Sequence, residues 1–359
     1  MGGGARIVAS LLTLGAAALA SYGFATCGHD TASAPGATQP SPRGATARAT
    51  GTPMPTAIDT ADPRETKMLS AKLQELRKGG RETVVYVAPT EEEEKAYRSW
   101  IRDVAGRASR GDAPPDSAPP GFEIDRTSGG ADVWLLAEQA QHRRGAGAVA
   151  IRVGPKPSAW IVEAPHTFFD AGTLPIAVAA FHRSGCRALV INTVHRNNPR
   201  LRGESSDGDG DEDGTQISAA DVAHAAHSFF LVAHEELQAV FPRAAALQLH
   251  GFRDEILEGT SVIVSAAGTR TVVGPIVSSL RAALGARSVR VFPDDVHVLG
   301  GTTNAQARAS TRSGAFFVHV ELSKSFRGKL VADAGARDRF VDALLVPLTP
   351  LSPPVGVIP

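Results

Sequence analysis

The chain has 359 residues, and its 37 Lys and Arg residues are balanced by 37 Asp and Glu residues. This zero net charge gives no electrostatic basis for binding a nucleic acid or an anionic membrane surface, so neither is expected as a partner. Hydrophobic residues make up 43% of the chain, which is sufficient for the core of a globular protein.

Residues 1–26 are predicted to be an export signal. Arg6 precedes an apolar run over residues 7–20, which has the length of a signal-peptide core and is short for a membrane span. Two processing routes remain open: cleavage at the small-x-small sequence of residues 18–20, or lipidation of Cys27 behind the lipobox-like residues 24–26. An uncleaved N-terminal anchor is the alternative to both. We expect a bacterial cell-envelope lipoprotein anchored through Cys27, or otherwise a periplasmic or secreted protein.

Residues 27–64 are dense in Thr, Ala, Pro and Ser and contain almost no large apolar side chains. They cannot bury a core, so a disordered linker is predicted there. The chain has two cysteines, Cys27 and Cys186, for which a disulfide is not expected. Two cysteines also exclude a metal site built from cysteine ligands.

Residues 65–359 are predicted to form a single α/β hydrolase-like domain. Strands are expected over residues 83–87, 132–136, 148–153, 159–162, 188–193, 244–249, 261–265, 289–292 and 316–320, and helices over residues 68–76, 91–108, 174–183, 219–240, 275–284 and 334–345. Alternation of this kind predicts a mixed, largely parallel central sheet with helices on both faces.

Four of the expected strands lead into side chains that can do chemistry. These side chains are His166, His195, His250 and Glu321. The carboxyl ends of parallel strands lie along one edge of a sheet, where ligands bind in open α/β folds. We therefore expect the four side chains to meet in one cleft.

Zinc is the expected occupant of that cleft, because catalytic zinc takes three protein ligands and keeps a fourth position for water. His166 and His250 are the predicted ligands, with Asp170 as the third and Glu163 as its alternative. Glu321 is the predicted general base. Each residue also has a structural interpretation: a hydrogen-bonded His, a helix-capping Asp170 or a salt-bridging Glu321.

Three segments resemble the zinc-dependent amidohydrolase superfamily, which includes N-formylglutamate amidohydrolases and zinc-type N-acetylmuramoyl-L-alanine amidases. The segments are PHTFFDAGT at residues 165–173, LQLHGF at residues 247–252 and VHVELSKSFR at residues 318–327. The muramoyl amidase hallmark of a His followed by two Gly is absent, since Thr167 and Phe168 follow His166. The resemblance covers residues 159–329 and implies a fold like that of the zinc exopeptidases.

The resemblance also implies roles for particular residues. Members of the superfamily carry an early His, an acidic ligand, a later strand-end His and a late Glu, and these positions fall on His166, Asp170, His250 and Glu321. The implied activity is that of an amidase, a hydrolase that uses zinc to cleave an amide bond. The expected substrate is a small peptide, an acyl-amino acid or a peptidoglycan fragment at the cell envelope.

His195 and Arg196 are candidate substrate-binding residues, since an Arg beside a zinc site can hold a carboxylate with two hydrogen bonds. The acidic residues 204–214 resemble a calcium loop, but Ala220 stands where the loop needs its bidentate Glu, so a solvated insertion is favoured. His224, His227 and His234 on the expected helix 219–240 are interpreted as surface residues paired with Asp221 or Glu235, and the alternatives are a rim or supporting layer of the zinc site or a separate metal site.

A second class of function remains open, namely a non-catalytic binding protein of the envelope on the same fold. No Gly-x-Ser-x-Gly sequence is present, which disfavours a serine esterase. The chain also lacks the glycine-rich fingerprints of nucleotide and dinucleotide binding.

Overall fold

The computed structural model of the chain describes residues 62–155, 158–198, 218–267 and 273–346. All described elements belong to one compact unit. The predicted export signal, Cys27, residues 27–61 of the predicted linker and the acidic residues 204–214 lie outside the described residues, so those predictions stay predictions. No described helix combines the length and the apolar character that crossing a membrane requires.

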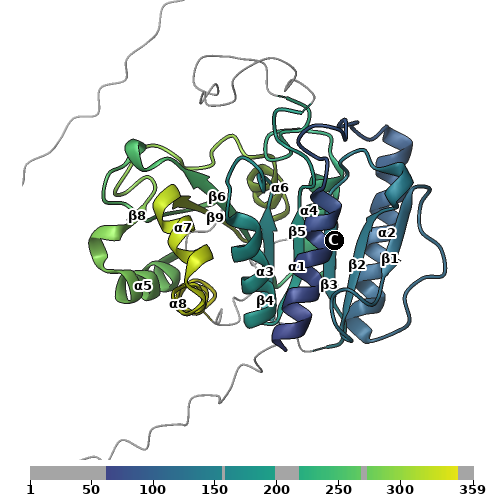
Figure 1. The fold of residues 1–359 in the computed structure, drawn as a ribbon, viewed down its shortest axis with the longest axis horizontal. Helices are drawn as coiled ribbons and strands as arrows, with labels where there is room; N and C mark the ends of the chain where they lie inside the picture. The colour runs from purple at the N-terminus through teal and green to yellow at the C-terminus, as the bar shows by residue number, and fades with distance from the viewer. Residues whose placement is uncertain (1–61, 156–157, 199–217, 268–272, 347–359) are drawn as a thin grey trace, which may run out of the picture. The chain divides into compact units, whose positions relative to one another are not determined.

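The described residues contain nine strands, which form one sheet (Figure 1). The strands are β1 (Phe122–Asp125), β2 (Val133–Glu138), β3 (Ala148–Arg152), β4 (Ser158–Ala164), β5 (Cys186–Ile191), β6 (Ala245–Phe252), β7 (Val262–Ala267), β8 (Val289–Val291) and β9 (Phe317–Ser323). Their order across the sheet is β1-β2-β3-β5-β4-β6-β9-β7-β8.

Strand direction divides the sheet into a parallel centre and antiparallel flanks. The neighbours β5, β4, β6 and β9 are all parallel. On one side β1, β2, β3 and β5 are antiparallel in turn, and on the other β7 is antiparallel to β9 while β8 is parallel to β7. The predicted α/β class and mixed sheet are confirmed. The expectation of a largely parallel sheet was wrong, because the short links between β1, β2 and β3 allow only antiparallel neighbours.

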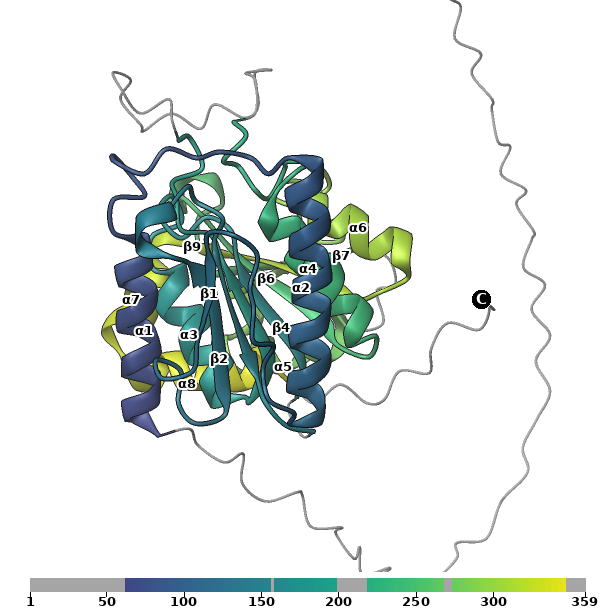
Figure 2. The same cartoon turned by 90° about the vertical axis from the view of Figure 1, so that its right-hand side faces the viewer.

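Helices cover both faces of the sheet. They are α1 (Pro63–Arg77), α2 (Glu91–Arg110), α3 (Thr173–Arg183), α4 (Phe229–Val240), α5 (Val273–Leu284), α6 (Ala305–Ser313), α7 (Lys324–Ala332) and α8 (Ala334–Leu344). Figure 2 shows α1, α3, α7 and α8 on one side of the sheet and α2, α4 and α6 on the other.

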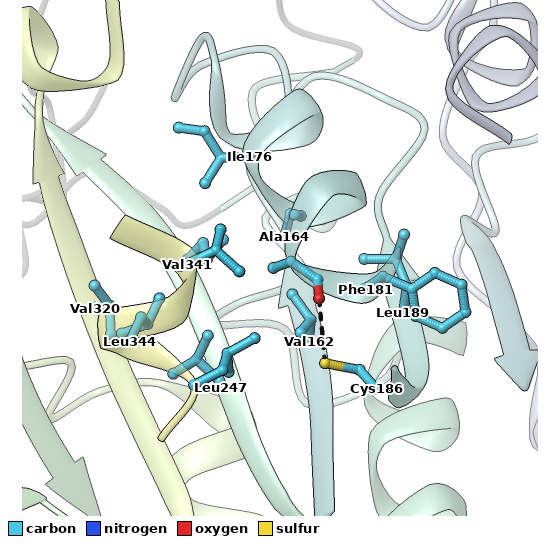
Figure 3. Close-up of a cluster of buried hydrophobic side chains, with 14 of the residues drawn as sticks. Val162, Ala164, Ile176, Phe181, Cys186, Leu189, Leu247, Val320, Val341 and Leu344 are labelled. Atoms are coloured by element: carbon cyan, nitrogen blue, oxygen red, sulfur yellow. Dashed lines mark hydrogen bonds between the residues drawn. The ribbon is translucent and has the colours of Figure 1, made fainter. Parts of the chain in front are cut away.

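Side chains of the central strands alternate between two apolar cores, as the period of a strand requires. Val162, Leu247 and Val320 come from three neighbouring strands and pack on the face that α3 and α8 cover (Figure 3). On the opposite face Ile161 and Val190 pack against α2 and α4. Because both faces of the sheet are buried, the sequences of the central strands are apolar runs. Any polar side chain within them must form its hydrogen bonds inside the protein.

Two expected elements are wrong over part or all of their length. Residues 83–87 form no strand, because none of the described strands pairs with them, and Val85 and Val87 are exposed. The expected helix over residues 219–240 is helical only from Phe229, where Ser228 caps it by accepting a hydrogen bond from the Leu231 amide. The preceding residues 218–228 form turns, and one of these places Asp221 in the site described below.

Candidate metal centre

A row of polar side chains crosses the central strands on the face covered by α4 and α6. Glu163 of β4 lies opposite Gln248 of β6 in the strand register. Gln248 and His250 of β6 in turn lie opposite His319 and Glu321 of β9. Positions two apart on a strand share a face, so the apolar neighbours of these residues point to the other core. The row ends near the carboxyl edge of the parallel strands.

The turn between β4 and α3 brings Asp170 back beside His166. The Asp170 amide donates to the His166 carbonyl at 2.8 Å, and the Thr173 amide and hydroxyl donate to the Asp170 carbonyl at 3.0 and 2.9 Å. Gly172, with φ of 98°, supplies the left-handed step before α3. The turn leaves His166 Nδ1 at 3.5 Å from Asp170 Oδ2, so both side chains can face one ion.

His250 completes a cluster with these two residues. Its Nδ1 lies 3.6 Å from Asp170 Oδ2, and its ring centroid lies 4.8 Å from that of His166. Ligands of a tetrahedral zinc ion, bound at about 2.0–2.1 Å, are separated by about 3.3 Å from one another. The three predicted ligands thus lie close to the spacing that one metal ion imposes, and all three are buried.

One buried oxygen atom of these three side chains lacks a hydrogen-bond partner. Asp170 Oδ2 has no hydrogen-bond partner among the described residues, although the side chain is buried. A buried carboxylate oxygen without a partner is destabilising, and this one faces a ring nitrogen of each histidine. A cation between the three atoms would satisfy all of them, so the residues present fit a divalent metal ion.

The second nitrogen of His166 is held by Asp221. His166 Nε2 lies 2.8 Å from Asp221 Oδ1, and Arg196 Nη2 lies 2.7 Å from Asp221 Oδ2. Burial alone would raise the pKa of Asp221, but His166, His224 and Arg196 hold it well below its usual value. A carboxylate on the far nitrogen orients a metal-binding imidazole and makes it more basic.

The second nitrogen of His250 is held by an amide instead. His250 Nε2 lies 2.7 Å from Gln248 Oε1. Burial, together with the neighbouring His319 and His166, lowers the pKa of His250 well below its usual value. The ring is therefore neutral, which is the form that binds a metal ion.

Glu321 and His319 lie beside this cluster on β9. His250, His319 and Glu321 form a second, overlapping group of ligand-type atoms. Glu321 Oε2 and His319 Nδ1 have no hydrogen-bond partner among the described residues, and His319 Nε2 lies 3.7 Å from Glu321 Oε1. Burial, followed by the charge of Asp170, raises the pKa of Glu321 to about 8. Glu321 can therefore carry a proton or release it near neutral pH.

Arg327 links the two chain segments that carry the ligands. Its Nε donates to the Ala171 carbonyl at 2.9 Å, next to Asp170, and its Nη1 donates to the carbonyls of Phe252 and Leu322. The side chain is buried and lies over Gly251, where a Cβ atom would overlap the guanidinium group. Arg327 thus ties the turn after β4 to the end of β6.

The other predicted site residues lie outside the two groups. His195 is buried against the rings of Phe168 and Phe169, and its Nδ1 accepts the Asn197 amide at 3.1 Å. Arg196 pairs with Asp221 as described above, and its guanidinium lies 4.9 Å from the centre of the Phe169 ring. Their substrate-binding roles stay predictions.

Glu163, the alternative third ligand, also belongs to neither group. Its two oxygens accept hydrogen bonds from His234 at 2.7 Å and Gln248 at 2.9 Å. Sequence reasoning assigned no role to Gln248 or His319. A signal was available, because each lies two positions before a predicted site residue on the same strand face.

A cavity of about 430 Å³ opens beside His319. Its wall combines apolar side chains such as Phe292 and Phe317 with the guanidinium groups of Arg308 and Arg312. The cavity therefore lies next to the candidate metal centre and can receive a group with both apolar and anionic parts.

No protein-family model and no curated protein matches the chain. Several solved structures show a distant likeness. The zinc-free form of the protein YndL is 17% identical, with a TM-score of 0.33, over 52% of this chain and 75% of its own. A suspected metallopeptidase from Shewanella amazonensis is 18% identical, with a TM-score of 0.32, over 57% of this chain and 84% of its own.

A glutaminyl cyclase from an Acidobacteriales bacterium is 11% identical, with a TM-score of 0.35, over 82% of this chain and 97% of its own. Likenesses this distant leave the function to be inferred from the geometry of the site. The resemblance to the zinc-dependent amidohydrolases stays a prediction.

Proposed function

We propose that this protein is a metal-dependent hydrolase that cleaves an amide bond, with one zinc ion held by His166, Asp170 and His250. The observation that carries the proposal is the position of Asp170 Oδ2. This buried oxygen is unpaired among the described residues, and Nδ1 of each histidine lies about 3.5 Å from it. Two imidazoles and a carboxylate are a ligand set typical of hydrolytic zinc.

Each residue of the site has a distinct task. A bound zinc ion supplies Lewis acidity and lowers the pKa of a water molecule. Glu321 lies opposite His250 in the strand register and has one unpaired oxygen, so it can accept the proton of the attacking water. It then passes that proton to the departing amine, as a general base and acid does in amide hydrolysis.

His319 connects the centre to the cavity. It lines the cavity, and its Nδ1 has no partner among the described residues. The side chain thus offers a hydrogen bond to a substrate held there. We place the substrate side chain that is adjacent to the scissile bond in this cavity. Phe292 and Phe317 would contact its apolar part, and Arg308 would lie near a polar end.

The cavity and the predicted export signal support the substrate class that we propose. A volume of about 430 Å³ accommodates one amino-acid side chain or a short acyl group. We propose a small peptide, an acyl-amino acid or a peptidoglycan fragment, hydrolysed at the cell envelope. The envelope location depends on residues 1–27, whose role stays a prediction.

The test of the metal centre is the zinc content of the purified full-length protein after zinc is supplied. We expect about one zinc ion per chain in the wild type, and its loss in both His166→Ala and His250→Ala. The matched control is His227→Ala, since His227 is exposed and pairs with Glu94 outside the cluster. Absence of bound zinc in the wild type would refute the proposal.

A further inference from the structure

We propose that Glu163 is a positioning residue, which acts through Gln248 to fix the tautomer of His250 so that Nδ1 faces the metal site. The inference rests on the proposed metal-dependent function, because the tautomer of His250 matters only if its Nδ1 binds a metal ion. The hydrogen bonds that carry it are independent of any bound ion. Glu163 and Gln248 are fully buried, and His250 is 5% exposed, so no solvent can replace these contacts.

The three residues form a direct chain of hydrogen bonds. Gln248 Nε2 donates to Glu163 Oε2 at 2.9 Å, and Gln248 Oε1 lies 2.7 Å from His250 Nε2. Glu163 and Gln248 are register partners on adjacent parallel strands, and His250 follows Gln248 on the same strand face. The sheet therefore places the carboxylate, the amide and the imidazole in one line.

Glu163 sets the direction of this chain together with Asn304, described below, and with Gln306, whose Oε1 accepts a hydrogen bond from Gln248 Nε2 at 3.3 Å. An amide side chain can turn over and exchange its donor and acceptor, but an ionised carboxylate can only accept. The NH₂ group of Gln248 must therefore face Glu163, which leaves its oxygen facing His250. His250 Nε2 then carries the proton, and the lone pair of Nδ1 points to Asp170 and the metal site.

Asn304 supports the same direction from another element. Its Oδ1 accepts the Ala307 amide at 2.9 Å as the N-cap of α6, so its NH₂ group faces away from the helix. That group donates to Gln248 Oε1 at 2.5 Å. Two independent partners thus require an acceptor oxygen at the same end of Gln248.

The carboxylate of Glu163 is itself anchored on α4 and α6. Its Oε1 lies 2.7 Å from His234 Nδ1, and His234 Nε2 lies 3.0 Å from the Ser310 hydroxyl. Gln238 Nε2 donates to the Phe316 carbonyl, so Gln238 Oε1 accepts from Ser310 at 2.8 Å. Ser310 must then accept from His234, which becomes a donor at both nitrogens and pairs with Glu163 as imidazolium with carboxylate.

This arrangement differs from the one at His166, where Asp221 contacts the ligand directly. A fully buried charge pair adds little to stability compared with an apolar core. The pair of Glu163 and His234 stands at the end of the hydrogen-bonded chain through Gln248 to His250. We therefore assign it to the control of which His250 nitrogen binds the metal, since partners behind a metal ligand determine this.

The first measurement uses selectively ¹⁵N-labelled histidine in the metal-free full-length wild type. Ring nitrogen shifts and couplings identify the protonated nitrogen of His250. We expect the proton on Nε2. A proton on Nδ1 would overturn the proposal, whether or not the protein binds zinc. The result is therefore distinguishable from the test of the metal centre.

The second measurement is zinc affinity, determined by competition with a chelator. We expect Glu163→Met and Gln248→Met to weaken zinc binding about 10- to 100-fold, because Gln248→Met removes the acceptor at His250 Nε2 and Glu163→Met removes the carboxylate that holds the Gln248 amide against it. Glu163→Gln is expected to bind zinc nearly as well as the wild type. Its amide oxygen can accept from Gln248 while its NH₂ group donates to His234.

The matched control is Gln238→Met, which makes the same change of side chain at a buried position beyond His234. It removes the partner of Ser310 but leaves the contacts between Glu163, Gln248 and His250 in place. We expect lower stability with unchanged zinc affinity. Equal zinc affinity in Glu163→Met and Gln238→Met would overturn the proposal, and the tautomer of the wild type decides the question if Glu163→Met does not fold.

Discussion

His166 Nε2 and Asp221 Oδ1 lie 2.8 Å apart inside the protein, although 55 positions separate the two residues in the chain. Asp221 lies in a turn before α4, in a segment that was expected to be helical and is not. The contact orients the first predicted metal ligand. It also connects the ligand to Arg196, which shares the same carboxylate.

Replacement of Asp221 by Asn tests this contact. Loss of the negative charge is expected to lower zinc affinity about 10- to 100-fold, because the carboxylate makes His166 more basic and holds its ring. The measurement is a competition titration with a chelator. The matched control is Glu94→Gln, which changes a carboxylate paired with the exposed His227. An equal effect of both changes would contradict the specific role of Asp221.

Replacement of Glu321 by Gln separates catalysis from metal binding. The variant is expected to retain zinc and to lose hydrolysis by about 10²- to 10⁴-fold in kcat, since it cannot accept a proton. The measurements are zinc content and turnover of an amide substrate that the wild type cleaves. Loss of zinc would instead assign Glu321 to the ligands. Undiminished turnover would exclude it as the general base.

Replacement of Ala267 by Phe tests the assignment of the cavity. Ala267 lines the cavity from β7 and packs beside Phe317 and Ala307 on the same face, so the added ring would occupy part of its volume of about 430 Å³. We expect KM to rise for substrates with a large side chain next to the scissile bond, with zinc content unchanged. Steady-state kinetics on a series of side-chain sizes measures this. A uniform fall in kcat across the series would place the substrate elsewhere.

His182 is expected to make the fold sensitive to acid. Burial, followed by the charge of Arg152, lowers its pKa to about 4, and neither ring nitrogen has a partner among the described residues. The ordinary value is 6.5, so the unfolded chain binds more protons between pH 6.5 and 4, and stability falls as pH falls through that window. At pH 5 the effect amounts to roughly 2 kcal/mol.

The variant His182→Leu should therefore lose less stability than the wild type between pH 7.5 and pH 5. Urea unfolding at the two pH values measures the difference. His142→Leu is the control, because His142 is exposed. Parallel pH dependence in the wild type and His182→Leu would show that His182 does not contribute.

Local patterns were sufficient for the parts of the site that lie close together in sequence. The apolar run before His166, the helix that begins after Gly172 and the strand that carries His250 all form as expected, because their side chains follow the period of the element. The bend that returns Asp170 to His166 depends on hydrogen bonds within the turn, which no local sequence pattern indicates.

Contacts between distant segments could not be predicted in the same way. Asp221 was placed on a helix by its apolar neighbours, yet its charge is held by His166 and Arg196 from other segments. Helix α6 was missed because its sequence is mostly small and polar, and its buried face consists of short alanine side chains together with Gln306 and Ser310. Tertiary partners outweighed local propensity in both places.

The space above Gly251 has a consequence for sequences related to this one. The guanidinium group of Arg327 fills that space while it joins the segment of Asp170 to the strand of His250. A side chain at position 251 would displace the group, and a shorter residue at position 327 would leave the space open to substitution. Glycine and arginine at these two positions should be inherited together, and the pair offers a marker by which distant chains with the same centre can be recognised.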